Sequence, residues 1–270
     1  MKVIAFLNNK GGVGKTATMT AVSHIFSEVF EKKVLNVDMD PQGNTGQLYG
    51  YSGMEGSYSL QELIEEKIYP VSDTVEDLLL DSEKDIRECI YETDYKNLSI
   101  IPSYLTLSEV ENRLLGDVTR PQQFRLKAQL EKISKEYDFC FIDCGPSVSL
   151  LNVNALTAAD VVYIPSRCDK DSRVGIANVI RLVKAVQGYH PKLELGGVFL
   201  TQYDDRKKIC QEAKEDCRNA LKEKFIEIPI PTNTKVEQAG SRQTPLYALD
   251  PYGKATQKYL DLANYILNHV

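Results

Sequence analysis

The sequence has no apolar run that approaches the roughly 20 residues needed to cross a bilayer. The N-terminal stretch "MKVIAFLNNKGG" contains too few apolar residues for a signal peptide, and it has no small-residue cleavage site. We therefore expect no membrane-spanning helix and no secretory leader. We interpret the N-terminal stretch as a buried first strand.

The sequence also lacks a Cys-x-x-Cys pair, the usual spacing of a zinc or redox site. In a chain of 270 residues, scattered cysteines are typical of reduced and mostly buried thiols in the cytoplasm. Two of the six flank a predicted strand end, but no histidine lies near them, so we expect no metal site there. The cysteines are Cys89, Cys140, Cys144, Cys168, Cys210 and Cys217.

The chain has fewer positive than negative side chains: it contains 32 Lys and Arg and 38 Asp and Glu, which gives a net charge of −6. This balance argues against a generally basic nucleic-acid-binding protein. The charge is uneven, however. Residues 165–225 hold more Lys and Arg than Asp and Glu, whereas the remainder is strongly acidic. The distribution is compatible with a local cationic face on an acidic protein.

Apolar runs alternate with amphipathic segments, which predicts an α/β fold: a doubly wound, mostly parallel twisted sheet with helices on both faces. β-branched and aromatic residues with few charges indicate strands buried on both sides. The expected strands are Lys2–Asn8, Lys33–Asp38, Leu98–Ile101, Asp138–Asp143, Asp160–Pro165 and Leu193–Leu200, with a short one at Phe225–Ile228. The expected helices are Lys15–Phe30, Pro121–Glu136, Ser172–Gln187, Lys207–Lys224 and Lys254–Asn268.

Residues 50–95 differ from the rest of the chain. They begin with Tyr and Gly ("YGYSGMEGSYS") and then become acidic ("EDLLLDSEKDIRE"). We interpret them as a surface excursion with short helices between the second and third strands. No internal repeat or low-complexity linker interrupts the sequence, so we expect one domain over residues 1–270.

The stretch "VIAFLNNKGGVGKTATMTAV" has the order of a phosphate-binding loop: strand, glycine-rich turn, helix. Glycines let successive backbone N–H groups point at phosphate oxygens, and the helix N-terminus adds partial positive charge. Lys15 would reach the β- and γ-phosphates, and the Thr16 hydroxyl would bind Mg²⁺. The sheet is therefore expected to be of the P-loop NTPase type. The candidate nucleotide-binding residues of the loop are Lys10, Gly11, Gly12, Val13, Gly14, Lys15, Thr16 and Ala17.

The loop departs from the common pattern G-x-x-x-x-G-K-[ST], because Asn9 stands in place of its first glycine and Lys10 follows. This Lys-Gly-Gly-x-Gly-Lys-Thr variant resembles the phosphate loop of the ParA/MinD family of ATPases. The resemblance implies that two ATP molecules are sandwiched between two monomers, and that Lys10 crosses the dimer interface to the γ-phosphate held by the other subunit. The alternative is that Lys10 serves its own subunit or only faces solvent.

Three aspartates follow predicted strands. Asp38 and Asp40 lie two residues apart, so an extended backbone points both the same way, at the sheet edge where ligands bind. Asp143 ends an apolar strand, where P-loop NTPases fix Mg²⁺. "DMDPQGN" resembles the family's second nucleotide motif, which implies water activation by Asp40 and metal support by Asp38. Alternatively, Asp40 only opens the turn at 41–43. The candidate catalytic residues are Lys10, Lys15 and Asp40, and the candidate metal residues are Thr16, Asp38 and Asp143.

The resemblance extends over nearly the whole chain. "IPIPTNTKVEQAGSRQTPLYALDP" is similar to the family's C-terminal loop, which closes over the nucleotide base. Gly145 stands where the family usually has proline, and Ala17 where it usually has a second threonine; neither change removes a group essential to hydrolysis. Thr232 stands where arginine is common, which removes a charged contact. The implied base contacts are Gln202, Pro231 and Asn233.

The ends of the sequence bear on partners. The phosphate loop begins so early that no N-terminal helix-turn-helix fits, and "KYLDLANYILNHV" lacks the basic face of a membrane-surface helix. We therefore expect no membrane partner, which disfavours the MinD branch. Short members of the family bind DNA without sequence preference as ATP dimers, through accessible positive charge. The candidate DNA contacts are Arg181, Lys184, Arg206, Lys207 and Lys208; the alternative for each is a solvated surface charge.

The resemblance implies a cytoplasmic, Mg²⁺-dependent ATPase of the ParA type, nucleoid-associated when ATP-bound. It would form a homodimer and segregate a plasmid, chromosome or mobile element, with a ParB-like partner that stimulates hydrolysis. One alternative is a positioning ATPase for a non-DNA cargo, which differs only in its partner. Others are a MinD-like ATPase, a small-molecule ligase or kinase, and a redox ATPase related to nitrogenase iron protein. The last needs cluster-bridging cysteines, and the spacing of Cys144 and Cys168 does not match.

Overall fold

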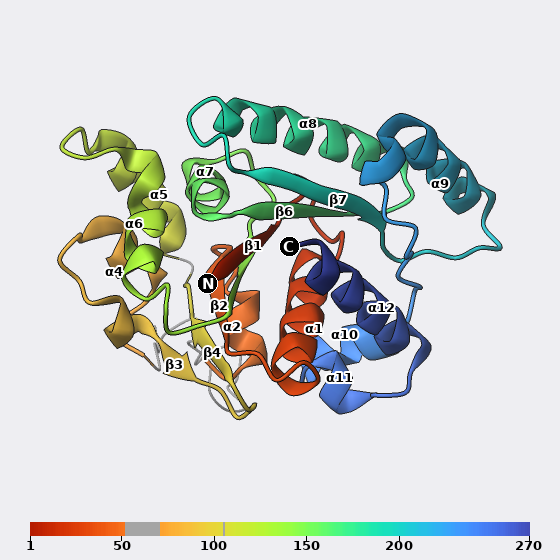
Figure 1. The fold of residues 1–270 in the computed structure, drawn as a ribbon, viewed down its shortest axis with the longest axis horizontal. Coiled ribbons are helices and arrows are strands. Elements are labelled where there is room, and N and C mark those ends of the chain that lie inside the picture. Colours follow the sequence, from red (N-terminus) through yellow and green to blue (C-terminus); the bar gives the residue numbers. More distant parts are fainter. Residues whose placement is uncertain (52–70, 105) are drawn as a thin grey trace, which may run out of the picture.

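The computed structural model describes residues 1–51, 71–104 and 106–270. Within these ranges seven strands form one sheet in the order β3-β4-β2-β5-β1-β6-β7 (Figure 1). Neighbouring strands run parallel except β3, which is antiparallel to β4. The strands are β1 (Lys2–Phe6), β2 (Val34–Met39), β3 (Tyr91–Glu92), β4 (Leu98–Ile101), β5 (Phe139–Cys144), β6 (Val161–Ser166) and β7 (Glu194–Leu200).

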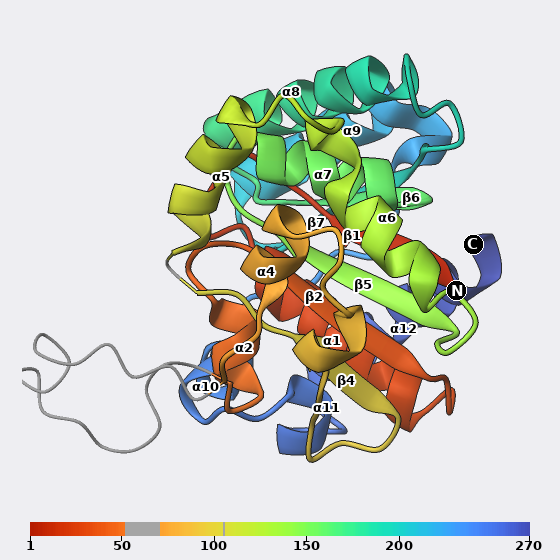
Figure 2. The ribbon, with the colours of Figure 1, turned by 90° about the vertical axis from the view of Figure 1, so that its left-hand side faces the viewer.

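Helices cover both faces of the sheet. Figure 2 shows α5–α9 on one face and α1, α2 and α10–α12 on the other. None of the helices in the described ranges has the length and apolarity to span a bilayer. The α-helices are α1 (Lys15–Glu28), α2 (Asn44–Leu48), α4 (Val75–Leu80), α5 (Leu107–Gly116), α6 (Arg125–Lys132), α7 (Leu150–Ala158), α8 (Lys170–Gln187), α9 (Lys208–Leu221), α10 (Thr234–Ser241), α11 (Leu246–Leu249) and α12 (Lys254–His269). Short 3-10 helices span Ile86–Cys89, Gln122–Phe124 and Lys222–Lys224.

The sheet separates two hydrophobic clusters because side chains along a strand alternate between its faces. In and just after β1, Val3, Ala5 and Leu7 pack into the cluster beneath α4–α9, whereas Ile4 and Phe6 pack into the cluster beneath α1 and α12. Every strand of the sheet's centre is thus buried on both sides. This confirms the predicted doubly wound, mostly parallel sheet.

The six long predicted strands are present within one or two residues of their expected ends. The short strand predicted at Phe225–Ile228 is wrong. Phe225 makes only an isolated bridge to Val198, and Pro229 has no N–H to continue a ladder. The predicted helix at Pro121–Glu136 divides into a 3-10 turn and α6, and the one at Lys207–Lys224 into α9 and a 3-10 turn.

Part of the predicted excursion lies outside the described residues, which omit 52–70. Its remaining part contributes to the fold more than a surface excursion requires. β3 pairs with β4 at the sheet's edge, and α4 inserts fully buried Val75 and Leu79 into the core beneath α4–α9. The acidic composition of this stretch concealed these apolar positions, because only every third or fourth residue of so short a helix faces the core.

His24 is a buried titratable group on the inner side of α1. Its side chain is 1% exposed, and neither ring nitrogen hydrogen-bonds to the described residues. The ring packs edge-on against Tyr95, with 4.7 Å between centroids. Burial lowers the pKa of His24 to about 4. The imidazole is therefore neutral in the folded protein at pH values where it is protonated in the unfolded chain.

This difference predicts a loss of stability in acid. Between pH 6.5 and about 4 the unfolded state binds more protons than the folded state. The free energy of unfolding is therefore highest above pH 6.5 and decreases as the pH falls from 6.5 to about 4. We expect wild type to lose about 3 kcal/mol more than His24→Phe between pH 7 and pH 4. Urea unfolding at several pH values measures this. The control His269→Phe removes an exposed histidine and should follow wild type.

Candidate nucleotide site

The glycine-rich loop lies between β1 and α1 at the carboxyl end of the sheet. Gly12 has φ 69° and Gly14 has φ 82°, in the left-handed region that favours glycine. Gly14 is also the N-cap residue of α1, so the loop delivers its backbone directly to a helix N-terminus. A helix N-terminus with free N–H groups is a binding place for phosphate.

The segment after β7 supports this loop from outside. The Thr201 hydroxyl donates to the carbonyl of Val13 at 2.7 Å, and the Gln202 amide donates to the carbonyl of Gly12 at 3.0 Å. The loop carbonyls are thereby held by protein donors. Their amides remain directed elsewhere, as a phosphate loop requires.

The three predicted aspartates meet at the ends of β2 and β5. Asp38 and Asp143 are register partners on these neighbouring strands. Asp143 Oδ2 accepts hydrogen bonds from the Thr16 hydroxyl at 2.6 Å and from the Thr45 hydroxyl at 2.9 Å. Asp40 Oδ1 accepts the N–H of Gln42 at 3.0 Å, so this carboxylate also shapes the turn after β2.

Asp38 is engaged by backbone groups on both oxygens. Its Oδ1 accepts the N–H of Asp40 at 3.1 Å, and its Oδ2 accepts the N–H groups of Thr45 and Gly46 at 3.0 and 3.1 Å. Asp38 therefore caps the N-terminus of α2. The family resemblance implies metal support by Asp38, and these hydrogen bonds give it a structural role as well.

Burial shifts the pKa values of the charged side chains in the site. Burial and the neighbouring Asp143 raise the pKa of Asp38 well above its usual range. Burial raises the pKa of Asp143 to about 6, and the charge of Asp40 adds to this. Burial also lowers the pKa of Lys15, although Asp143 and Asp40 oppose that change. One lysine thus faces several carboxylates, and the site has room for a further cation.

The residues present fit Mg²⁺. Asp143 Oδ1 is buried and has no hydrogen-bond partner among the described residues, so it is free to accept from a metal-bound water. The Thr16 hydroxyl donates its hydrogen to Asp143 Oδ2, so the lone pairs of its oxygen are available to bind a metal ion. A hydroxyl, a carboxylate and substrate phosphates form the oxygen environment that Mg²⁺ prefers.

A cavity of about 410 Å³ opens beside the loop and brings most candidates together. Residues from distant parts of the chain line it: the loop, the turn after β2, Pro146 after β5, residues 201–202, residues between 230 and 237, and Tyr259 of α12. The three candidate base contacts lie among residues 201–202 and 230–237. The predicted residues that line the cavity are Gly11, Gly12, Gly14, Lys15, Thr16, Ala17, Asp40, Gln202, Pro231 and Asn233.

Lys10 points away from this cavity and toward the N-terminus of α8. Its ammonium forms a short ion pair with Asp169 and a 3.8 Å ion pair with Asp171. Asp169 is the N-cap residue of α8 and accepts the N–H of Ser172 at 3.0 Å. Lys10 is thus held at the rim by its own chain, with 28% of its side chain exposed.

Gly145 lies against the turn after β2. A Cβ on Gly145 would meet Pro41 Cδ at 3.6 Å and Asp40 at 3.8 Å, which are ordinary contacts. The Asn152 amide donates to the carbonyl of Gly145 at 2.9 Å. Space alone therefore does not require glycine at this position.

The candidate DNA contacts fall into two separate groups. α8 starts at the carboxyl end of the sheet and runs back along it, so Arg181 and Lys184 lie toward its far end (Figure 1). Both are exposed and form no ion pair within the described part of the chain. The other group precedes and opens α9, and there Arg206 is paired with Asp204 at 3.0 Å.

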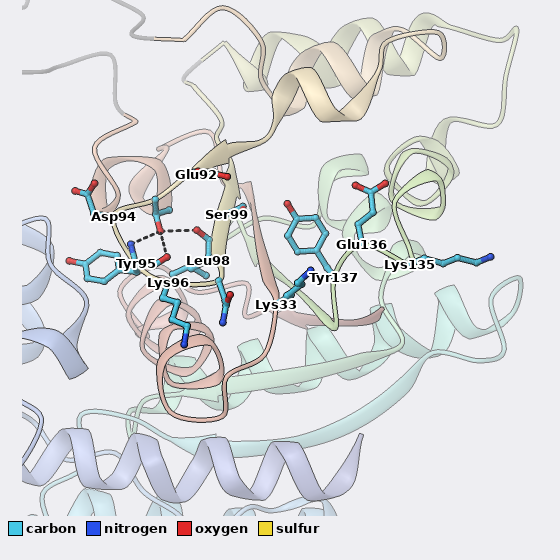
Figure 3. A pocket seen from close by; sticks show the side chains of 12 residues that line it. Lys33, Glu92, Asp94, Tyr95, Lys96, Leu98, Ser99, Lys135, Glu136 and Tyr137 are labelled. Atoms are coloured by element: carbon cyan, nitrogen blue, oxygen red, sulfur yellow. Dashed lines mark hydrogen bonds between the residues drawn. The ribbon is translucent and has the colours of Figure 1, made fainter.

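A larger groove of about 810 Å³ lies at the opposite edge of the sheet (Figure 3). Residues that precede β2, β4 and β5 line it, among them Lys33, Asn97 and Tyr137. Both lysines and carboxylates line it, and no glycine loop or helix N-terminus contributes to its lining. Ligands of parallel α/β sheets bind at the carboxyl ends of the strands, so the smaller cavity is the candidate nucleotide site.

Comparison with known proteins agrees with this geometry. A family model described as "AAA domain" matches residues 1–195. Sporulation initiation inhibitor protein Soj from Bacillus subtilis is 34% identical over 263 residues, which cover 97% of this chain and 96% of that protein. The chain belongs to the ParA/MinD family, as a ParA-type member.

Two further relatives cover almost the entire chain. Chromosome partitioning protein ParA from Myxococcus xanthus is 33% identical over 267 residues, 98% of this chain and 88% of that protein. A solved structure of cobyrinic acid a,c-diamide synthase from Mycobacterium smegmatis, with a bound ATP analogue and magnesium, is 26% identical with a TM-score of 0.78. It covers 100% of this chain and 95% of that one. This ParA-type protein is an ATP hydrolase with ATP and Mg²⁺ as cofactors.

Several residues of the site were missed in the sequence. Thr45 and Thr201 hold Asp143 and the loop, but isolated threonines carry no spacing signal. Asp169 lies 159 positions from Lys10, and only the fold brings them together. Asn8, which donates to the carbonyl of Pro165 at 2.7 Å, could have been found as a polar residue at the end of an apolar strand.

The buried charge of Asp143 yields a testable prediction. Asp143→Asn should raise the unfolding free energy of the nucleotide-free protein by about 1–3 kcal/mol at pH 8, because a carboxylate with a raised pKa is removed. The same change should abolish the extra thermal stabilisation that Mg²⁺ gives with ATP. Thermal unfolding with ATP in Mg²⁺ or EDTA measures both effects.

The control is Asp160→Asn, which removes a carboxylate that accepts the N–H of Val3, before β6 and away from the site. It should keep the Mg²⁺-dependent stabilisation. If Asp143→Asn kept it as well, Asp143 would have no part in metal binding.

Proposed function

We propose that this protein is a partition ATPase that forms an ATP-sandwich homodimer, binds DNA without sequence preference and is stimulated by a ParB-like partner. The observation that carries the proposal is the position of Lys10 on the rim of the cavity. A cation that lies outside its own nucleotide site and is paired there only with carboxylates of α8 is suited to a phosphate held by a second copy. Relatives named as chromosome partitioning proteins support the cellular role.

Within one subunit, each candidate residue of the site has a separate role in hydrolysis. Lys15 and the loop amides hold the phosphates, and Thr16 and Asp143 hold Mg²⁺, which neutralises charge on the phosphates. Asp40, at the cavity wall beside Gly145, orients the attacking water. Lys10 of a second subunit supplies positive charge to the γ-phosphate, so nucleotide occupancy controls pairing.

Two exposed apolar side chains are candidates for a self-association surface. Val148 lies two residues after the cavity residue Pro146 and is 65% exposed, and Val174 near the start of α8 is 60% exposed. Exposed apolar side chains of this kind are compatible with an interface that a second copy covers. Dimerisation would bury them and exchange Asp169 for a phosphate as the partner of Lys10.

The DNA-binding surface is assigned to the far half of α8. Arg181 and Lys184 are one turn apart, exposed and unneutralised, as phosphate contacts require. Arg206 is already neutralised by Asp204, and Lys208 pairs with Glu212 at 3.6 Å. A dimer would present the α8 surface twice. In the cell the protein would be cytoplasmic and nucleoid-associated when ATP-bound.

A ligase is the second candidate, because the likeness to the diamide synthase structure reaches 26% identity over the whole chain. A ligase would turn over ATP only with a second small-molecule substrate. ATP hydrolysis that DNA and a partner protein stimulate, with no other substrate present, would exclude it.

Lys10→Ala tests the dimer. We expect ATP affinity to stay within about threefold of wild type, because Lys15 still binds the phosphates, while ATP-dependent dimers disappear in sedimentation velocity. The control Lys170→Ala removes an exposed cation one residue after Asp169 and should leave the dimers intact. ATP-dependent dimers of Lys10→Ala at wild-type concentrations would refute the cross-subunit role.

The double variant Arg181→Glu/Lys184→Glu tests the DNA surface. It should weaken retention of random-sequence DNA with ATP by about tenfold or more and lower its salt dependence, because phosphate contacts are lost. Nucleotide affinity should not change. Arg206→Glu, a charge reversal at an already paired site, should have a smaller effect. A larger effect of Arg206→Glu would place the DNA surface at residues 206–208 instead.

A further inference from the structure

Thr45 connects the two buried aspartates of neighbouring strands. It is fully buried in the first turn of α2. Its hydroxyl donates to Asp143 Oδ2 at 2.9 Å, and its backbone N–H donates to Asp38 Oδ2 at 3.0 Å. No other described residue is shown to hydrogen-bond to both carboxylates.

The hydrogen bonds on Asp143 are unevenly distributed. Oδ2 accepts two hydroxyls, from Thr16 and Thr45, whereas Oδ1 accepts none from the described residues although it is buried. Two donors on one oxygen, from α1 and α2, fix the rotation of the carboxylate about its last bond. The free oxygen Oδ1 is thereby kept in one orientation, with its lone pairs available to an outer-shell water of a metal.

The two donors differ in kind. The Thr16 hydroxyl at the start of α1 is itself a candidate metal ligand, so Asp143 would share it with the metal when Mg²⁺ is bound. Thr45 does not line the cavity, and α2 is anchored to Asp38 through the N–H groups of Thr45 and Gly46. Thr45 is therefore the fixed donor of the pair.

We propose that Thr45 is a positioning residue for Mg²⁺: its hydroxyl holds Asp143 so that Oδ1 stays available to the metal's water shell. The proposal concerns metal binding within one subunit. It goes beyond the proposed function, because it requires neither dimerisation nor DNA nor a partner protein.

The test compares Thr45→Val, which keeps the shape but removes the hydroxyl, with Thr45→Ser, which keeps the hydroxyl. The readout is the affinity for a fluorescent, non-hydrolysable ATP analogue in Mg²⁺ and in EDTA. For Thr45→Val we expect the gain in affinity that Mg²⁺ provides to fall by about tenfold or more, as with other outer-shell partners of metal sites. Affinity in EDTA should match wild type, and Thr45→Ser should retain most of the gain.

The control variant is Thr157→Val. Thr157 is a fully buried threonine in α7 whose hydroxyl donates to the carbonyls of Gln123 and Asn154, outside the site. It should lower thermal stability without altering the Mg²⁺-dependent gain, which separates loss of a buried hydroxyl from loss of this one. Because the N–H bonds to Asp38 survive in Thr45→Val, that variant is expected to fold.

Two results would overturn the proposal. If folded Thr45→Val keeps the full Mg²⁺-dependent gain, the hydroxyl does not position Asp143. If Thr45→Ser loses the gain as fully as Thr45→Val does, the methyl group and its packing are responsible. Neither result bears on ATP-dependent dimers or DNA retention, so failure here is distinguishable from failure of the partition function.

Discussion

The burial of negative charge at the ends of β2 and β5 is the constraint on which the rest of the structure depends. Asp38 and Asp143 are register partners on neighbouring strands, and both side chains are fully buried. Backbone N–H groups of α2 satisfy Asp38, and two threonine hydroxyls satisfy one oxygen of Asp143. The other oxygen of Asp143 has no hydrogen-bond partner among the described residues, and Lys15 is the cation buried beside these carboxylates. Negative charge therefore exceeds positive charge in the site, and Mg²⁺ would offset the difference when it is bound with the nucleotide.

The phosphate loop connects the site with distant parts of the chain. The phosphate loop is supported by Thr201 and Gln202 after β7, and it leads through Lys10 to the first turn of α8. α8 also approaches β1 closely, because a Cβ on Gly175 would lie 2.5 Å from Asn8 Oδ1. α8 is tied to the loop at its N-terminal end and exposes Arg181 and Lys184 toward its C-terminal end. A shift of the loop could therefore change the position of these two basic residues.

The sequence was sufficient to predict the sheet and to place the glycine loop and the aspartates at its carboxyl end, because each depends on local order: a strand, then glycines or an aspartate, then a helix. It was insufficient where contacts join distant segments. The role of Asp38 as a cap, the Thr45 bond to Asp143 and the Asp169 partner of Lys10 arise only when β2, β5 and α8 come together. The strand expected at Phe225 failed because propensity ignores the missing N–H of Pro229.

The most direct measurement of the central claim is a crystal structure with a non-hydrolysable ATP analogue and Mg²⁺. We expect the metal at the Thr16 hydroxyl and the phosphates, with Asp143 Oδ1 accepting from a metal-bound water and Oδ2 still bonded to Thr45. A metal bound elsewhere, or an Asp143 carboxylate turned so that Oδ1 faces the core, would contradict it.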